Sequence, residues 1–162
     1  MLFYKLQHFL GGDAMKYSMR LSDAVHLLLF VQLNPGQPLS SDAIAKSICT
    51  NPSYVRQMMA KLKAAGLLNS SRGQAKPSLS RAAGEISLLD VYRAVEGDKP
   101  LLHLDTHTNP DCGVGVHIQY ALQTYFDRVQ RETEASMQQI TLQDVLSTYH
   151  QETLNSRRTK TD

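Results

Sequence analysis

The most restrictive feature of this sequence is a tight break between two short helical segments. Residues 40–42, Ser-Ser-Asp, supply N-cap chemistry for the helical stretch AIAKSIC. Asn51 can cap the next helix, and Pro52 suits its first turn, where no backbone N–H is needed. That second helix ends at Gly66, a residue typical of helix C-termini. The spacing predicts a helix, a tight turn and a second helix.

The second of these helices combines an apolar stripe with a polar and basic outer face. Val55, Met58 or Met59, and Leu62 recur at helical spacing and predict its buried side. The major groove of B-DNA admits one helix, where arginine pairs with guanine and glutamine pairs with adenine. The residues predicted to reach bases are Ser53, Tyr54, Arg56 and Gln57, and those predicted to meet phosphates are Lys61 and Lys63.

The stretch after Gly66 changes character and predicts a β-hairpin. The segments LLNSS and SLSR read as two short strands that flank a basic tip, RGQAK. We expect Arg72 and Lys76 of this tip to contact DNA, with Arg72 suited to a narrow, electronegative minor groove. The predicted fold class is therefore mostly α with a small β-hairpin wing. The alternative is a helical bundle that contains a helix–turn–helix without binding DNA.

Charge divides the chain into two halves. Residues 15–81 carry nine Lys and Arg against two Asp, a net charge of +7, whereas residues 82–162 carry seven basic and twelve acidic residues, a net charge of −5. Such asymmetry is typical of nucleic-acid binding. The alternative is a solvated basic surface, for instance a protein–protein module that binds an acidic partner. RNA is disfavoured, because Tyr54 alone offers an aromatic ring on the predicted recognition surface.

A long amphipathic helix is predicted in the C-terminal half. Apolar residues recur every three or four positions from Ile118 to Ile140, with charged residues between them. This seam packs either within the monomer or against a two-fold mate. We predict a homodimer, since a helix-turn-helix gains affinity by meeting two half-sites. The residues predicted at the dimer interface are Ile118, Leu122, Tyr125, Phe126, Val129 and Met137.

The run AIAKSICTNPSYVRQMMAKLKAAGLLNSSRG, followed by EISLLDVYRAVEG, resembles the Rrf-two family of bacterial winged-helix regulators, the IscR and NsrR relatives. The resemblance extends through DCGVGVHIQYALQTYF and QQITLQDVL, and so covers roughly residues 15–147. It implies a winged helix-turn-helix domain, a long C-terminal dimerisation helix and a two-fold DNA operator. Repression is the commoner mode of this family, and its members often sense iron–sulfur status, nitric oxide or redox state.

The sequence departs from this family in its sensor loop. Sensor members have three cysteines there that hold an iron–sulfur cluster, whereas this chain has Cys112 alone and places Pro100 and Thr106 near the other two positions. The wing, RGQAKPSLSR, also differs from the usual R-G-x-x-G-G. The chain therefore resembles the cysteine-poor branch. We expect no cofactor and no metal, and an effector, small-molecule or redox, that the sequence does not identify.

Cys112 is the candidate sensor residue of this loop. It lies close to the start of the long helix, where the macrodipole favours a thiolate and hence a redox switch, but we favour packing at a dimer interface. His103 and His107 could complete a metal site with it, although exposed loop histidines are the favoured interpretation. An enzyme with a Cys112 nucleophile lacks a recognisable third catalytic group. Cys49 is expected in the core.

The predicted organisation has five parts. Residues 1–14 are expected to be an upstream extension, because Gly11-Gly12 matches an in-frame translation of a ribosome-binding site before Met15. Residues 15–97 form the winged helix-turn-helix domain, 98–112 an effector or sensor loop, 113–150 the dimerisation helix region and 151–162 a disordered tail. No apolar run approaches a membrane span of about 18 residues, and no secretory signal is evident, so we predict a cytoplasmic location.

Overall fold

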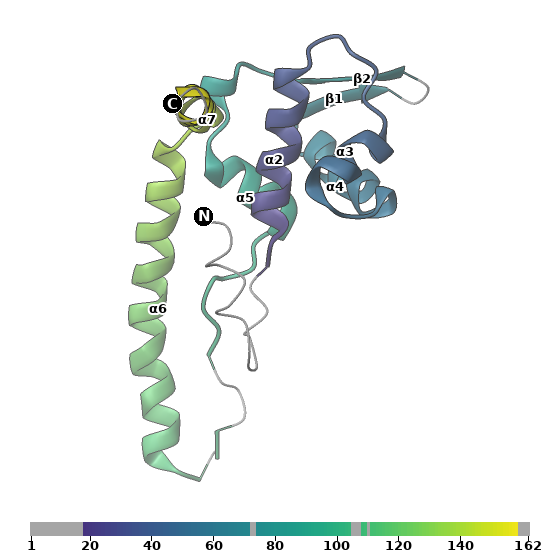
Figure 1. The fold of residues 1–162 in the computed structure, drawn as a ribbon. Helices are drawn as coiled ribbons and strands as arrows, with labels where there is room; N and C mark the ends of the chain where they lie inside the picture. The colour runs from purple at the N-terminus through teal and green to yellow at the C-terminus, as the bar shows by residue number, and fades with distance from the viewer. Residues whose placement is uncertain (1–17, 72–73, 105–107, 110, 159–162) are drawn as a thin grey trace.

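The N-terminal half of the fold is a group of helices with a hairpin on one side (Figure 1). The computed structural model describes residues 18–71, 74–104, 108–109 and 111–158, so the predicted extension at 1–14 lies outside the described residues. The predicted class, mostly helical with a small hairpin wing, is confirmed. The elements of this half are α2 (Arg20–Leu33), α3 (Ser41–Ile48), α4 (Pro52–Ala64), β1 (Leu68–Ser71), β2 (Gln74–Leu79), η2 (Ala83–Glu85) and α5 (Leu88–Glu96).

Helix α2 lies at the centre of the core because its apolar residues recur at helical spacing. Leu27 and Leu28 are fully buried, and Leu142 of the C-terminal helix belongs to the same cluster. The predicted inward stripe of α4 is confirmed, with Met58 rather than Met59 as its central residue. The buried residues of α2 are Ala24, Leu27, Leu28 and Val31, and those of α4 are Val55, Met58 and Leu62.

Local capping explains where α3 and α4 begin and end. The Ser40 hydroxyl accepts a hydrogen bond from the Ala43 N–H at 3.1 Å, and the Asn51 side chain accepts one from the Tyr54 N–H at 2.8 Å. Helix α3 ends at Ile48, and Cys49 follows in the left-handed conformation with φ of 58°. The expectation that Cys49 belongs to the core is wrong: it is exposed, because the left-handed residue ends the helix before its side chain can turn inward.

The hairpin starts its second strand earlier than the sequence suggested. Leu68 pairs with Leu79 and Asn69 with Ser78 in an antiparallel register. Because β2 begins at Gln74, Lys76 lies on a strand and is exposed there, rather than in the tip. The predicted tip residue Arg72 lies outside the described residues.

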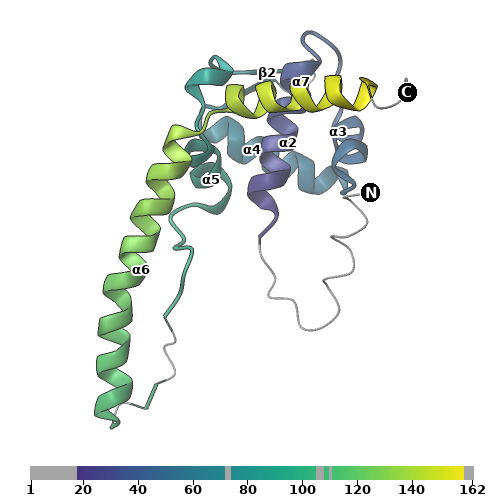
Figure 2. The ribbon, with the colours of Figure 1, turned by 60° about the vertical axis from the view of Figure 1, so that its left-hand side comes forward.

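Helix α6 (Gly113–Gln139) leads away from the core, and α7 (Leu142–Arg158) returns across α2 (Figures 1 and 2). Their junction is tied to the domain by the Leu88 N–H, which donates to the Ile140 carbonyl at 2.8 Å, and the Leu142 N–H, which donates to the Ile86 carbonyl at 2.9 Å. No helix in the described ranges is both long and apolar enough to cross a membrane.

The prediction of a disordered tail from residue 151 is wrong for the part that the structure describes. Helix α7 continues to Arg158. Leu142 and Leu146 are buried in the core, and this docking nucleates the helix. The following residues contain no glycine or proline that would end it. Residues 159–162 lie outside the described residues.

Candidate nucleic-acid interface

The outward face of α4 presents three of the residues predicted to read bases. Ser53, Arg56 and Gln57 are exposed, on the side opposite the buried stripe. The Arg56 guanidinium donates to the Ser41 hydroxyl at the start of α3, at 3.1 Å. This contact was not anticipated from the sequence. It holds the arginine across the two helices of the motif while leaving most of its donors available.

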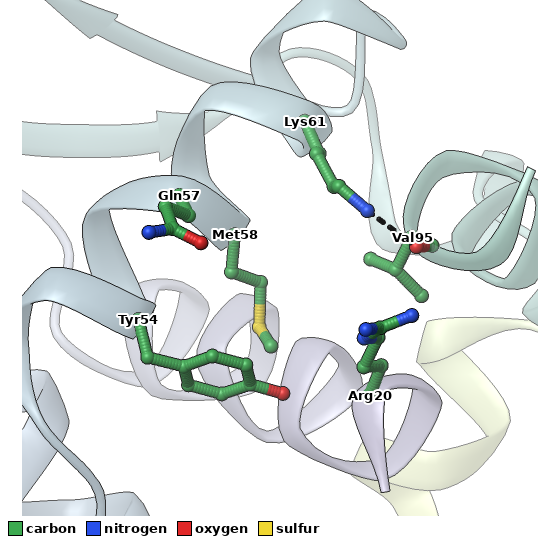
Figure 3. Close-up of a pocket in the computed structure, with 6 residues that line it drawn as sticks. All are labelled: Arg20, Tyr54, Gln57, Met58, Lys61 and Val95. Atoms are coloured by element: carbon green, nitrogen blue, oxygen red, sulfur yellow. Dashed lines mark hydrogen bonds between the residues drawn. The ribbon is translucent and has the colours of Figure 1, made fainter. Parts of the chain in front are cut away.

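Tyr54 is placed differently from the prediction. Its hydroxyl donates to Asp23 of α2 at 3.0 Å, and its ring is half-buried on the flank of α4 (Figure 3). Burial, followed by the hydrogen bond to Asp23, raises the pKa of Tyr54 to about 12. Tyr54 therefore fixes α4 against α2, and its hydroxyl is engaged within the protein. The pairing joins residues far apart in the chain, so helical periodicity gave no sign of it.

Replacing Tyr54 by phenylalanine should flatten the pH dependence of stability at alkaline pH. In the unfolded chain the phenol ionises near its ordinary pKa of 10, whereas in the folded protein the pKa is about 12. The protonated phenol thus stabilises the folded state below about pH 10, and this contribution is lost as the pH rises towards 12. Urea unfolding of both proteins across this range tests the effect. An equally steep loss in Tyr54→Phe would contradict the assignment.

The two lysines predicted to meet phosphates are engaged with backbone carbonyls. The Lys61 ammonium donates to the Val95 carbonyl at the end of α5, at 2.8 Å (Figure 3), and Lys63 donates to the Ser70 carbonyl of the wing at 2.6 Å. Lys61 is exposed, as expected for a residue on the outward side, and its ammonium reaches back to α5. Long flexible side chains reach neighbours that sequence spacing does not reveal. Lys76 remains an exposed cation on β2.

Polar contacts connect the loop after α5 to α6. The Tyr92 hydroxyl donates to the Lys99 carbonyl at 2.8 Å, and the Leu101 N–H donates to the Gln130 side chain at 2.9 Å. Arg93 and Glu134 form an ion pair at 2.9 Å. Hydrogen bonding from Gln130, with a further contribution from Arg93, lowers the pKa of Glu134. One face of α6 is thereby held to its own domain.

The predicted dimerisation seam of α6 lies beside that face. Ile118, Tyr125 and Val129 are exposed by 48%, 57% and 40%, although large apolar side chains are usually covered. Leu122, Phe126 and Met137 are half-buried. The seam is therefore an apolar surface of α6, and its exposed half is not covered by any of the described residues.

The residues considered for sensing do not form a metal site in the described part of the chain. Cys112 is exposed at the N-cap of α6, His103 is exposed in the preceding loop, and His107 lies outside the described residues. No three side chains of metal-binding type lie together among the residues that were described. Cys49, the other thiol, is exposed in the turn between α3 and α4.

Comparison with known proteins supports this geometry. Residues 17–148 match the Rrf2 family, described as an iron-dependent transcriptional regulator. The chain is 40% identical over 128 residues to YwnA of Bacillus subtilis (strain 168), which is named as an HTH-type transcriptional regulator; the match covers 79% of this chain and 95% of YwnA.

Solved structures show the same fold. One, described as that of a DNA-binding protein, is 38% identical with a TM-score of 0.64, and the match covers 78% of this chain and 98% of that one. CymR, described as the global cysteine regulator of Bacillus subtilis, is 21% identical with a TM-score of 0.60, over 83% of this chain and 98% of CymR. The second likeness concerns the fold alone. The family consists of transcriptional regulators and not of enzymes, and this chain belongs to it: it is an Rrf2-family transcriptional regulator with a winged helix-turn-helix fold.

Proposed function

We propose that this protein binds a two-fold DNA operator as a homodimer and represses transcription in the cytoplasm. The carrying observation is the outward face of α4, where Arg56 and Gln57 are exposed next to one another directly after the capped turn. Arginine and glutamine have the side chains best suited to paired hydrogen bonds with guanine and adenine. The positive charge of residues 15–81 supplies the attraction to phosphates. Lys76 on the wing is a candidate phosphate contact.

The apolar surfaces of the monomer support dimerisation. A groove of about 760 Å³ lies where α2, α3 and α7 meet, and Val25, Leu29, Phe30, Leu33 and Tyr149 supply its apolar lining. The exposed seam of α6 is a second uncovered apolar surface. Helix α6 leads away from its own domain, so its seam does not reach the groove of the same chain (Figures 1 and 2). A second copy of the chain can cover both surfaces at once in a symmetric dimer.

The response to an effector is also a proposal. The description of the family as iron-dependent implies iron, but the sensor loop supplies one thiol, Cys112, and no three metal-binding side chains lie together among the described residues. This donor set does not fit an iron–sulfur cluster held by three cysteines. We therefore propose regulation by a small molecule or by oxidation of the exposed Cys112 thiol, with packing of Cys112 against a second subunit as the alternative.

Binding to the DNA upstream of its own gene tests the proposed function. The purified protein is titrated against a labelled upstream fragment and an unrelated fragment at several salt concentrations. We expect tight binding to the upstream fragment and a steep fall of the logarithm of the binding constant with that of the salt concentration, since each neutralised phosphate contributes roughly −0.9 to the slope. A genomic selection for bound fragments extends the test to distant operators. Equal, weak binding to all fragments would instead favour a basic module for an acidic protein partner.

A further inference from the structure

A small cavity beside α4 is lined by hydrogen-bond donors and by apolar side chains. It has a volume of about 140 Å³ and lies where α2, α4 and α5 meet (Figure 3). It is separate from the seam of α6 and from the apolar groove described above. Its lining residues are Arg20, Tyr54, Gln57, Met58, Lys61 and Val95.

The donors of this cavity exceed the acceptors that the protein offers them. Arg20 donates from one nitrogen to Glu96, at 3.3 Å, although a guanidinium carries five N–H groups. Lys61 uses one of its three ammonium protons on the Val95 carbonyl, at 2.8 Å. The Gln57 amide makes no hydrogen bond to any part of the chain that the structure describes. Arg20, Gln57 and Lys61 are exposed, so the unused donors of the two cations are accessible to an anion from solvent.

The other lining residues restrict the chemical nature and the size of a ligand in this cavity. Met58 and Val95 are buried and make an apolar floor, and the ring of Tyr54 closes one side (Figure 3). No carboxylate lines the cavity. The two nearby acids are already engaged, because Asp23 accepts from the Tyr54 hydroxyl and Glu96 accepts from Arg20 and from the Ser18 hydroxyl. The small volume restricts a ligand to a few non-hydrogen atoms.

We propose that this cavity binds a small carboxylate with a short apolar chain, held by Arg20 and Lys61 and packed on Met58 and Val95. The site also bears on DNA binding, because Gln57 both lines the cavity and lies on the outward face of α4. A carboxylate that accepts a hydrogen bond from Gln57 turns the amide away from a base. This regulatory consequence rests on the proposed function, whereas ligand binding itself does not.

Propionate and its uncharged analogue propionamide test the site without DNA. Protein labelled in its methionine methyl groups is titrated with each compound, and the Met58 signal is identified by its loss in Met58→Leu. We expect a saturable shift of the Met58 signal with propionate and none with propionamide, because a neutral amide gains little from two cations.

Two lysines of the same helix provide matched variants. Lys61→Gln should weaken propionate binding by roughly tenfold or more, the loss expected for a charge-assisted contact worth about 1.5 kcal/mol. Lys61→Arg should retain it. Lys63→Gln should bind as the original protein does, since Lys63 contacts the wing and not the cavity. Three outcomes would contradict the proposed carboxylate site. They are the absence of a saturable shift with propionate, an equal shift with propionamide, and an equal loss of propionate binding in Lys61→Gln and Lys63→Gln.

The regulatory part is tested separately with the DNA fragment selected above. Affinity is compared in sodium propionate and sodium chloride of equal ionic strength, for the original protein and for Lys61→Gln. A loss of affinity in propionate that is absent in Lys61→Gln supports the coupling. Unchanged affinity overturns the coupling and leaves the site in place. If the protein does not bind the fragment even in sodium chloride, the proposed function fails. This result differs from a failure of the ligand site and from a failure of the coupling.

Discussion

Replacing Ile118 and Val129 together by aspartate should convert the proposed dimer to monomers. Both side chains belong to the exposed seam of α6, with exposures of 48% and 40%. In a dimer they become buried, and a buried, unpaired carboxylate costs several kcal/mol. A cost of about 3–5 kcal/mol weakens association by roughly 100- to 4,000-fold. Sedimentation equilibrium across a range of protein concentrations measures this effect directly.

The same double substitution should also lower operator affinity, because a monomer meets one half-site at a time. Linking two binding events commonly raises affinity by about 100-fold or more, and this gain is lost with the dimer. Thr124→Asp is the matched control, since Thr124 is exposed on α6 on the side opposite the seam. It should leave both the mass and the affinity unchanged. If the double variant remains dimeric, α6 does not form the dimer interface. If it is monomeric but binds the operator with full affinity, dimerisation is not needed for DNA binding.

Truncating Arg56 or Gln57 to alanine should change which DNA sequences the protein prefers. Both are exposed on α4, and the Arg56 guanidinium is steadied by the Ser41 hydroxyl at 3.1 Å. A bidentate contact between a side chain and a base is worth about 1–3 kcal/mol of discrimination, and a dimer uses it in each half-site. The measurement is a selection of bound sequences from a random library, followed by titration of the operator and of single-base variants.

Lys76→Ala should lower DNA affinity without changing sequence preference, in contrast to Arg56→Ala and Gln57→Ala. Lys76 is exposed on β2, where an ammonium can reach a phosphate but reads no base. Its loss should weaken all DNA alike and reduce the salt slope by about one for each phosphate contact removed. If Arg56→Ala and Gln57→Ala instead behave like Lys76→Ala, α4 does not read the bases. Thermal unfolding of all three variants checks that the fold is intact, since substitutions at exposed sites usually change stability by about 0.5 kcal/mol or less.

What the sequence determined by itself was local in origin. The side chains of Ser40 and Asn51 accept hydrogen bonds from N–H groups three residues ahead. The first residues of α3 and α4 could therefore be predicted from a few neighbouring residues. The buried stripe of α4 and the apolar seam of α6 follow from helical periodicity, which needs no knowledge of the partner surface. The class of fold and the exposed face of the recognition helix could be derived from these features.

Tertiary structure alone decided what the long polar side chains do. Tyr54 binds Asp23, 31 positions away, and so leaves the face that periodicity assigned to it. Lys61 stays exposed but binds the Val95 carbonyl, 34 positions away. The helix beyond residue 150 depends on Leu142 and Leu146 docking into a core made by distant helices. The cavity beside α4 exists only where three helices meet. Each of these outcomes depends on distances between segments that a local pattern does not encode, because packing brings the segments together only after each has formed.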